Sequence, residues 1–120
     1  MAVPEHAVHY LEIVTPDPEA ARHHYGAAYG LSFQPMAPEL GNAFVATLPG
    51  GTLFGIRAPM SEQETPIVRT YLRVADVEKA VQEIIRLGGG IALEPMDLPG
   101  HGRIAIYLYG GIQQGVWQTP

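Results

Sequence analysis

Tyr10-Leu-Glu-Ile-Val-Thr-Pro-Asp17-Pro-Glu-Ala-Ala and Tyr71-Leu-Arg-Val-Ala-Asp76-Val-Glu-Lys-Ala are two stretches of this chain with the same organisation. Each is a run of apolar and aromatic residues typical of a strand, followed by an Asp that is suited to cap a helix. The two Asp residues lie 59 positions apart, about half of the 120-residue chain. The chain is therefore predicted to contain one structural module twice.

The predicted modules share one order of elements. Module one covers residues 6–57, with a helix from 18 to about 29 and strands at 8–14, 31–34, 43–48 and 52–57. Residues 58–66 form a linker, and module two covers 67–118, with a helix at 77–87 and strands at 67–74, 91–94, 103–108 and 113–118. The predicted fold class is α+β: one domain over residues 1–120, in which two tandem βαβββ modules form a cupped mixed β-sheet.

Composition excludes several classes of protein. The chain has no cysteine, so it offers no disulfide, thiolate nucleophile or Cys-based metal site. Its net charge of −5, with only seven Lys and Arg residues, argues against a nucleic-acid partner. No apolar run approaches the length of a membrane span, and the first residues lack the pattern of a secretory signal. A cytoplasmic protein without membrane or nucleic-acid partners is therefore expected.

Strand alternation predicts which side chains line the cup. Leu11 and Ile13 are expected to face the first helix, which leaves Tyr10 and Glu12 in the cup. The same reasoning turns His9 toward the helices. A single shift of register would reverse any of these assignments. The predicted ligand-binding residues are Tyr10, Glu12, Arg57, Arg69, Tyr71, Arg73, Gln113 and Trp117, and Glu12 is the one candidate for a catalytic general base.

Four motifs together resemble the vicinal oxygen chelate superfamily, which includes glyoxalase I, extradiol dioxygenases, methylmalonyl-CoA epimerase and bleomycin resistance proteins. They are Glu-Ile-x-Thr-Pro-Asp-Pro-Glu-x-Ala at 12–21, His-Tyr-Gly-Ala-x-Tyr-Gly-Leu at 24–31, Val-x-Asp-Val-x-x-Ala-Val at 74–81 and Leu-Gly-Gly-x-Ile at 87–91. Residues 94–105 and 115–118 are similar to a bacterial glyoxalase-like subgroup. The resemblance covers residues 8–118, and it also implies a homodimer.

The resemblance implies four positions for metal ligands, and this chain departs from the pattern at each. The family places a His seven residues before the first capping Asp, where this chain has Tyr10, and the equivalent position in module two is Arg69. The two positions in the last strands, usually Glu, His or Gln, are Gly55 and Gly115. Glycine has no ligand atom, and an arginine would repel a divalent cation. No metal and no other cofactor is expected.

Three functions are compatible with these features. The leading hypothesis is a glyoxalase-like protein that binds a small organic molecule in the cup, either to sequester it or for metal-independent chemistry. Its arginines would hold a carboxylate or phosphate while Trp117 and the tyrosines stack on an apolar body. The alternative within the superfamily is a metal-dependent lyase, isomerase or dioxygenase. The third is an interaction protein whose cup is closed by ion pairs between Glu12 and the arginines.

Overall fold

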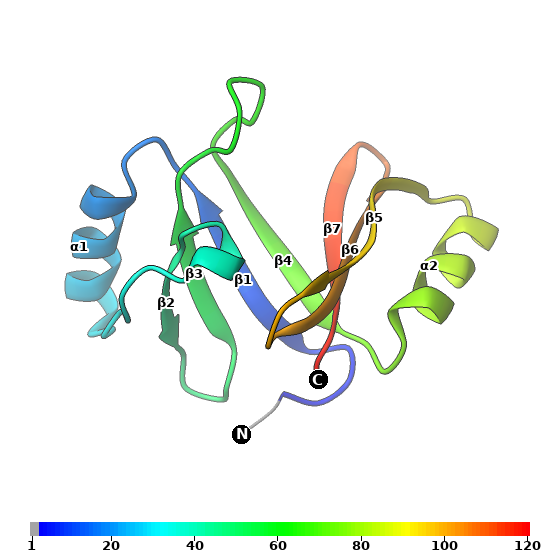
Figure 1. Ribbon diagram of the computed structural model, residues 1–120, viewed down its shortest axis with the longest axis horizontal. Coiled ribbons are helices and arrows are strands. Elements are labelled where there is room, and N and C mark those ends of the chain that lie inside the picture. The colour runs from blue at the N-terminus through cyan, green and yellow to red at the C-terminus, as the bar shows by residue number, and fades with distance from the viewer. Residues whose placement is uncertain (1–2) are drawn as a thin grey trace.

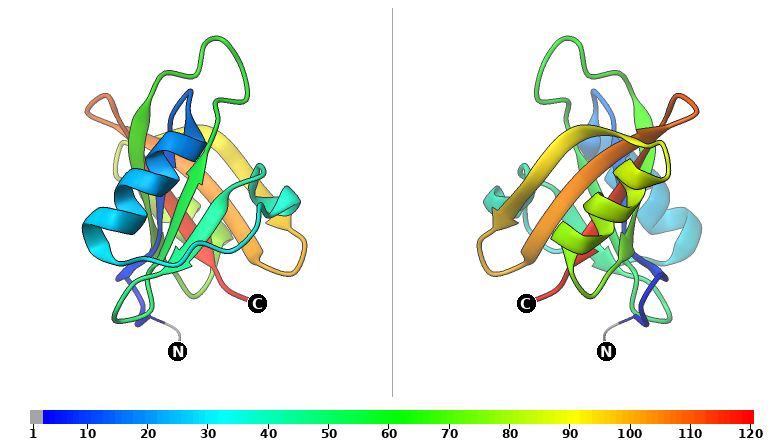
Figure 2. Two further views of the ribbon diagram at one scale, coloured as in Figure 1. Left: turned by 90° about the vertical axis from the view of Figure 1, so that its left-hand side faces the viewer. Right: turned by 90° about the vertical axis from the view of Figure 1, so that its right-hand side faces the viewer.

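The computed structural model describes residues 3–120. Seven strands form one mixed sheet in the order β2-β3-β1-β4-β7-β6-β5, with α1 and α2 on its outer side at opposite ends (Figures 1 and 2). The predicted α+β class and cupped mixed sheet are confirmed. The elements are β1 (Val8–Val14), α1 (Pro18–Tyr29), the 3-10 helix η1 (Pro38–Leu40), β2 (Phe44–Thr47), β3 (Leu53–Arg57), β4 (Ile67–Arg73), α2 (Val77–Arg86), β5 (Gly90–Leu98), β6 (Gly102–Tyr109) and β7 (Ile112–Gln118).

Both helices begin where the repeated motif predicts. The Asp17 carboxylate accepts a hydrogen bond from the backbone N–H of Ala20 at 3.0 Å, and the Asp76 carboxylate accepts one from Lys79 at 3.1 Å. These bonds satisfy N–H groups that a helix start leaves without an intrahelical partner. Gly30 ends α1 with a φ of 64°, a conformation that glycine adopts without steric cost.

The strand expected at 31–34 does not form. The chain there runs beside β2, and the N–H of Gln34 donates to the carbonyl of Val45 and the N–H of Ala37 to the carbonyl of Ala43. Pro35 and Pro38, which follow residues 31–34, have no N–H to donate. Module one therefore adds three strands to the sheet and module two adds four.

The two modules meet where β1 pairs with β4. This antiparallel pair places Tyr10 opposite Tyr71 and Glu12 opposite Arg69. On either side the pairing is parallel, with Glu12 beside Gly55 on β3 and Tyr71 beside Gly115 on β7. The centre of the sheet thus has approximate twofold symmetry, in which Tyr10 corresponds to Arg69, Glu12 to Tyr71 and Arg57 to Trp117.

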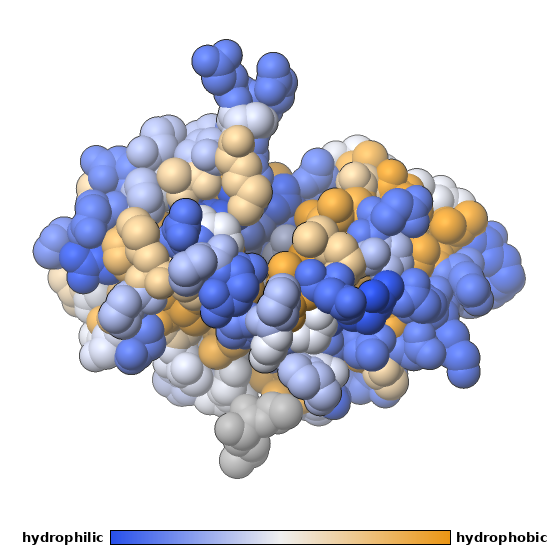
Figure 3. All heavy atoms as spheres, in the orientation of Figure 1, coloured by the Kyte–Doolittle hydropathy of each residue, from blue (hydrophilic) through white to orange (hydrophobic). Residues whose placement is uncertain are grey.

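Each helix packs on the outer face of the sheet through apolar side chains. Under α2, Val77 and Val81 pack with Val116 of β7. Under α1, Tyr25 packs against a cluster of Ile13, Phe54 and Ile56. In the view of Figure 3, hydrophobic residues gather mainly over the half of the molecule built by module two. No helix within residues 3–120 is long and apolar enough to cross a membrane.

Candidate functional site

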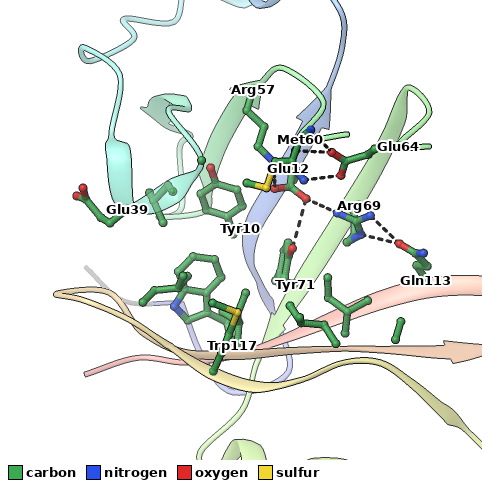
Figure 4. A pocket seen from close by; sticks show the side chains of 18 residues that line it. Tyr10, Glu12, Glu39, Arg57, Met60, Glu64, Arg69, Tyr71, Gln113 and Trp117 are labelled. Carbon is green, nitrogen blue, oxygen red and sulfur yellow. Dashed lines mark hydrogen bonds and ion pairs between the residues drawn. The ribbon is translucent and has the colours of Figure 1, made fainter. Parts of the chain in front are cut away.

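A cavity of about 400 Å³ opens on the inner face of the sheet (Figure 4). Both modules and the linker contribute to it, so the site needs the whole repeat. Its volume lies within the range of small-molecule sites in proteins. The lining residues are Tyr10, Glu12, Glu39, Leu40, Gly41, Arg57, Met60, Glu64, Arg69, Tyr71, Ala92, Leu93, Met96, Leu98, Ile104, Ile106, Gln113 and Trp117.

The structure brings seven of the eight predicted residues together and leaves one out. Tyr10, Glu12, Arg57, Arg69, Tyr71, Gln113 and Trp117 all line the cavity. Arg73 does not line the cavity, although it pairs with Trp117 and keeps the alternation of β4. Its Nε donates to the Thr119 hydroxyl at 3.4 Å, near the end of the chain.

The pairing of β1 with β4 contains one irregularity. Val8 pairs with Leu72 and Tyr10 with Tyr71, so β1 carries an extra residue, His9, at this point. Such a bulge interrupts the alternation on which the sequence reasoning depends. His9 consequently lies beside Trp117, with the ring centroids 5.0 Å apart, and does not turn toward the helices as predicted. Burial first, and then the nearby Arg73, lowers the pKa of His9.

Glu12 is the centre of the polar end of the cavity. Its Oε2 accepts from Arg57 Nε at 2.9 Å and its Oε1 from Arg69 Nη1 at 2.5 Å. The Tyr71 hydroxyl lies 3.3 Å from the same Oε1. Glu12, Arg57 and Arg69 are only 7%, 5% and 6% exposed. This carboxylate therefore joins β1 to β3 and β4 through two buried ion pairs.

The linker supplies a second carboxylate. Arg57 donates from Nη1 to Glu64 Oε1 at 2.8 Å and from Nη2 to Oε2 at 2.7 Å, a bidentate arrangement. Arg69 donates its remaining bonds to the amide oxygen of Gln113, at 2.6 Å from Nη2. Two carboxylates and two guanidinium groups therefore form one network with no net charge.

The Arg57–Glu64 pair predicts a dependence of stability on pH. Hydrogen bonding to Arg57 lowers the pKa of the Glu64 carboxyl to about 2. Because the folded-state pKa is the lower one, this pair stabilises the fold above the unfolded-state pKa and loses that effect as pH falls toward 2. We expect Glu64→Gln to be less stable than the wild type at pH 7, and the difference to narrow from pH 5 to pH 3. Urea unfolding at each pH measures it; a constant difference would contradict the assignment.

Three aromatic side chains form the floor. Tyr10 and Trp117 are stacked, with centroids 5.1 Å apart and planes 21° from parallel. Tyr71 stands edge-on to both, at 5.9 Å and 5.5 Å. Burial, followed by the negative charge of Glu12, raises the pKa of both tyrosines, so both hydroxyls keep their protons at neutral pH.

Module two and the rim enclose the floor. The apolar wall comes from β5 and β6 and includes Leu93, Leu98 and Ile104. At the mouth, Glu39 of η1 meets the imidazole of His101 at 3.0 Å. The carbonyl of His101 also accepts a hydrogen bond from Trp117 Nε1 at 2.8 Å. One loop of module two is thus joined both to module one and to the floor.

The rim residues Glu39, Met60 and Glu64 are not among the predicted ligand-binding residues. Glu39 lies in the three-residue helix η1 and the other two lie in the linker, where no periodicity indicates the direction of a side chain. The acidic character of the linker was the one available signal. Arg57 is buried and needs negatively charged partners. Glu64 is its second carboxylate partner, after Glu12.

Tyrosine side chains occupy the space beside two of the four implied metal-ligand positions. A Cβ atom at Gly55 would lie 1.7 Å from the Tyr10 hydroxyl, and one at Gly115 would lie 2.1 Å from Cδ2 of Tyr71. The tyrosines therefore fill the space in which ligand side chains would begin, and Arg69 is bonded to Glu12. Within residues 3–120, no group of three His, Asp or Glu residues is placed to hold a metal ion.

Comparison with known sequences gives relatives but no match to a family model. The chain is 29% identical over 117 residues to a protein named "Putative glyoxylase CFP32" from Mycobacterium bovis, and equally to that of Mycobacterium tuberculosis. The alignment covers 92% of this chain and 44% of the relative. The chain thus spans less than half the length of these curated relatives.

Solved structures share the fold. Methylmalonyl-CoA epimerase from Mycobacterium tuberculosis superposes with a TM-score of 0.78 at 15% identity, covering 100% of this chain and 92% of the other. The hypothetical protein BH1468 from Bacillus halodurans gives 0.75 at 15% identity, covering 95% and 94%. The Streptomyces coelicolor epimerase in complex with 2-nitronate-propionyl-CoA gives 0.70 at 15%, covering 97% and 99%. The chain therefore has the vicinal oxygen chelate, or glyoxalase-like, fold, and the resemblance predicted from its sequence is confirmed.

Proposed function

We propose that this protein binds a small organic molecule in the cavity without a divalent metal, either to sequester it or for metal-independent chemistry. The observation that carries the proposal is the cavity of about 400 Å³, which has an aromatic floor, an apolar wall and one polar end. Sites of this kind bind compact organic ligands. The open volume counts against a cup closed by its own side chains, although the charged network does hold the polar end together.

The first test uses a neutral fluorescent probe, N-phenyl-1-naphthylamine, whose emission rises in apolar surroundings. We expect saturable binding of one probe per chain. Leu93→Trp places an indole in the cavity wall and should abolish this binding. Ile85→Trp is the matched control, because Ile85 is 52% exposed on α2. Absence of a saturable signal, or equal signals from wild type and Leu93→Trp, would overturn the proposal.

The competing function is a metal-dependent enzyme of the same fold. The names of the epimerase structures and of the glyoxylase relatives favour it. The residues at the implied metal-ligand positions argue against this function, because they are two glycines, an arginine and a tyrosine. The side chains present do not fit a divalent cation.

Native mass spectrometry of protein purified without chelator separates the two functions. We expect a mass equal to that of the polypeptide, with or without an organic adduct, and the same probe affinity after treatment with EDTA. A stoichiometric mass excess matching zinc, nickel, iron or manganese would reject the metal-free proposal and favour a metal-dependent enzyme.

A further inference from the structure

The hydroxyl of Tyr10, a residue that lines the cavity, has no hydrogen bond to the described residues. Figure 4 labels the ten principal residues, and no hydrogen bond joins the hydroxyl of Tyr10 to another side chain drawn there. Tyr10 as a whole is only 2% exposed, yet its hydroxyl is not among the fully buried side-chain atoms without a partner in residues 3–120, where His9 Nδ1 is the one found. The hydroxyl of this cavity-lining residue therefore keeps contact with the cavity and can donate to a ligand there.

The charged groups of the cavity, in contrast, already have partners. Glu12 and Glu64 accept from Arg57, and Glu12 also accepts from Arg69. At the rim, Glu39 is partnered by His101. An incoming charged group would have to compete with ion pairs that are already formed and partly buried, and it would lose its own hydration in doing so.

We infer that the occupant of the cup is a neutral molecule with an aromatic or aliphatic body and one hydrogen-bond acceptor, such as a carbonyl oxygen, which the Tyr10 hydroxyl binds. This inference rests on the proposed function and names the ligand class of the same site. It replaces the earlier expectation that the arginines clamp an anion, because their guanidinium groups are occupied by Glu12, Glu64 and Gln113.

The surroundings of Tyr10 fix the position of this donor. Its ring is stacked on Trp117, and its hydroxyl lies in the space that a side chain at residue 55 would otherwise fill. Gly55 therefore permits the ring to lie flat against the sheet with the hydroxyl at the polar end. The raised pKa of this hydroxyl keeps it a donor at neutral pH. A ligand body would then lie against the wall of β5 and β6.

A matched series of naphthalenes tests the inference by displacement of N-phenyl-1-naphthylamine at pH 7.5. The members are 2-acetylnaphthalene, which is neutral with an acceptor, 2-ethylnaphthalene, which lacks the acceptor, 2-naphthoate and 2-naphthylmethylammonium. We expect the ketone to bind about fivefold more tightly than the ethyl compound, as one hydrogen bond provides. Both ions should bind at least about tenfold more weakly than the ketone.

Two phenylalanine variants assign the effect to one hydroxyl. Tyr10→Phe should equalise the ketone and the ethyl compound. Tyr71→Phe should keep their difference, because the Tyr71 hydroxyl is directed to Glu12. The comparison of the four compounds on wild type needs no variant, so the test stands even where a variant folds poorly.

Each other outcome has a definite meaning. Tighter binding of naphthoate would show that a carboxylate displaces Gln113 from Arg69, and tighter binding of the ammonium would show an available carboxylate. Either result overturns the inference and leaves a ligand-binding cup. Equal binding of the ketone and the ethyl compound would show that the Tyr10 hydroxyl does not bind the acceptor, and would overturn the inference. If N-phenyl-1-naphthylamine itself does not bind, the proposed function fails first and the inference fails with it.

Discussion

Glu12→Gln should lower the free energy of unfolding by about 3–5 kcal/mol, the usual effect of removing one partner from a buried ion pair. Glu12 is the single carboxylate bonded to both Arg57 and Arg69. In the variant Arg57 retains Glu64, but Arg69 keeps only the amide of Gln113. A buried guanidinium without a counter-charge is then the source of the loss. Urea unfolding at pH 7 measures the change.

Two further variants decide whether this explanation is right. Glu19→Gln removes an exposed ion pair with Arg22 on α1 and should have little effect. The double variant Glu12→Gln, Arg69→Gln removes the uncompensated charge as well, so its loss should be smaller than the sum of the two single losses. If Glu12→Gln behaves like Glu19→Gln, the network is hydrated and contributes little to stability.

Gly115→Ala should destabilise the fold by about 1–3 kcal/mol, because the added methyl group overpacks the floor of the cup. The new Cβ would lie 2.1 Å from Cδ2 of Tyr71 and 2.6 Å from its Cγ. These atoms belong to the base of a rigid ring, so the ring as a whole must move. It is held edge-on to Trp117 and Tyr10.

Gly90→Ala is the matched control for this prediction. Gly90 also lies in a strand, its backbone is not left-handed, and a Cβ there would meet nothing within 4 Å. That variant should be neutral or slightly stabilising, because alanine restricts the unfolded chain. Combining Gly115→Ala with Tyr71→Leu should recover part of the loss. Urea unfolding compares all four proteins, and a loss for Gly115→Ala no larger than that for Gly90→Ala would contradict the close contact.

The fold was predictable because its signals are local and appear twice. Each helix start depends on an Asp followed by helix-forming residues, and Asp17 and Asp76 both cap as expected. The strand predicted at 31–34 does not form, and Pro35 and Pro38, which follow these residues, have no N–H to donate to the neighbouring chain. A repeat in sequence thus indicated the module without guaranteeing every strand in it.

The site was predictable only as far as strand alternation holds. Tyr10, Glu12, Arg69 and Tyr71 lie in regular pairing and line the cavity as expected. His9 lies at the bulge and was misplaced because alternation does not reveal where an extra residue enters a strand. Arg73 keeps the alternation of β4, since it pairs with Trp117, but it lies beyond the cavity, at the Thr119 hydroxyl. Glu64 lies in the linker, where its direction is set by a tertiary contact with Arg57. No local pattern contains that information.

The approximate twofold symmetry at the centre of the sheet limits the site that two identical modules could form. Positions that correspond in the two modules carry different chemistry: Tyr10 against Arg69, Glu12 against Tyr71, Arg57 against Trp117. Two identical half-length chains would have to place the same side chain at both members of each pair. Such a pair would set Glu12 against a second Glu where it now meets the Tyr71 hydroxyl. A charged cluster with no net charge beside an aromatic floor therefore requires two modules of different sequence, which one continuous chain provides.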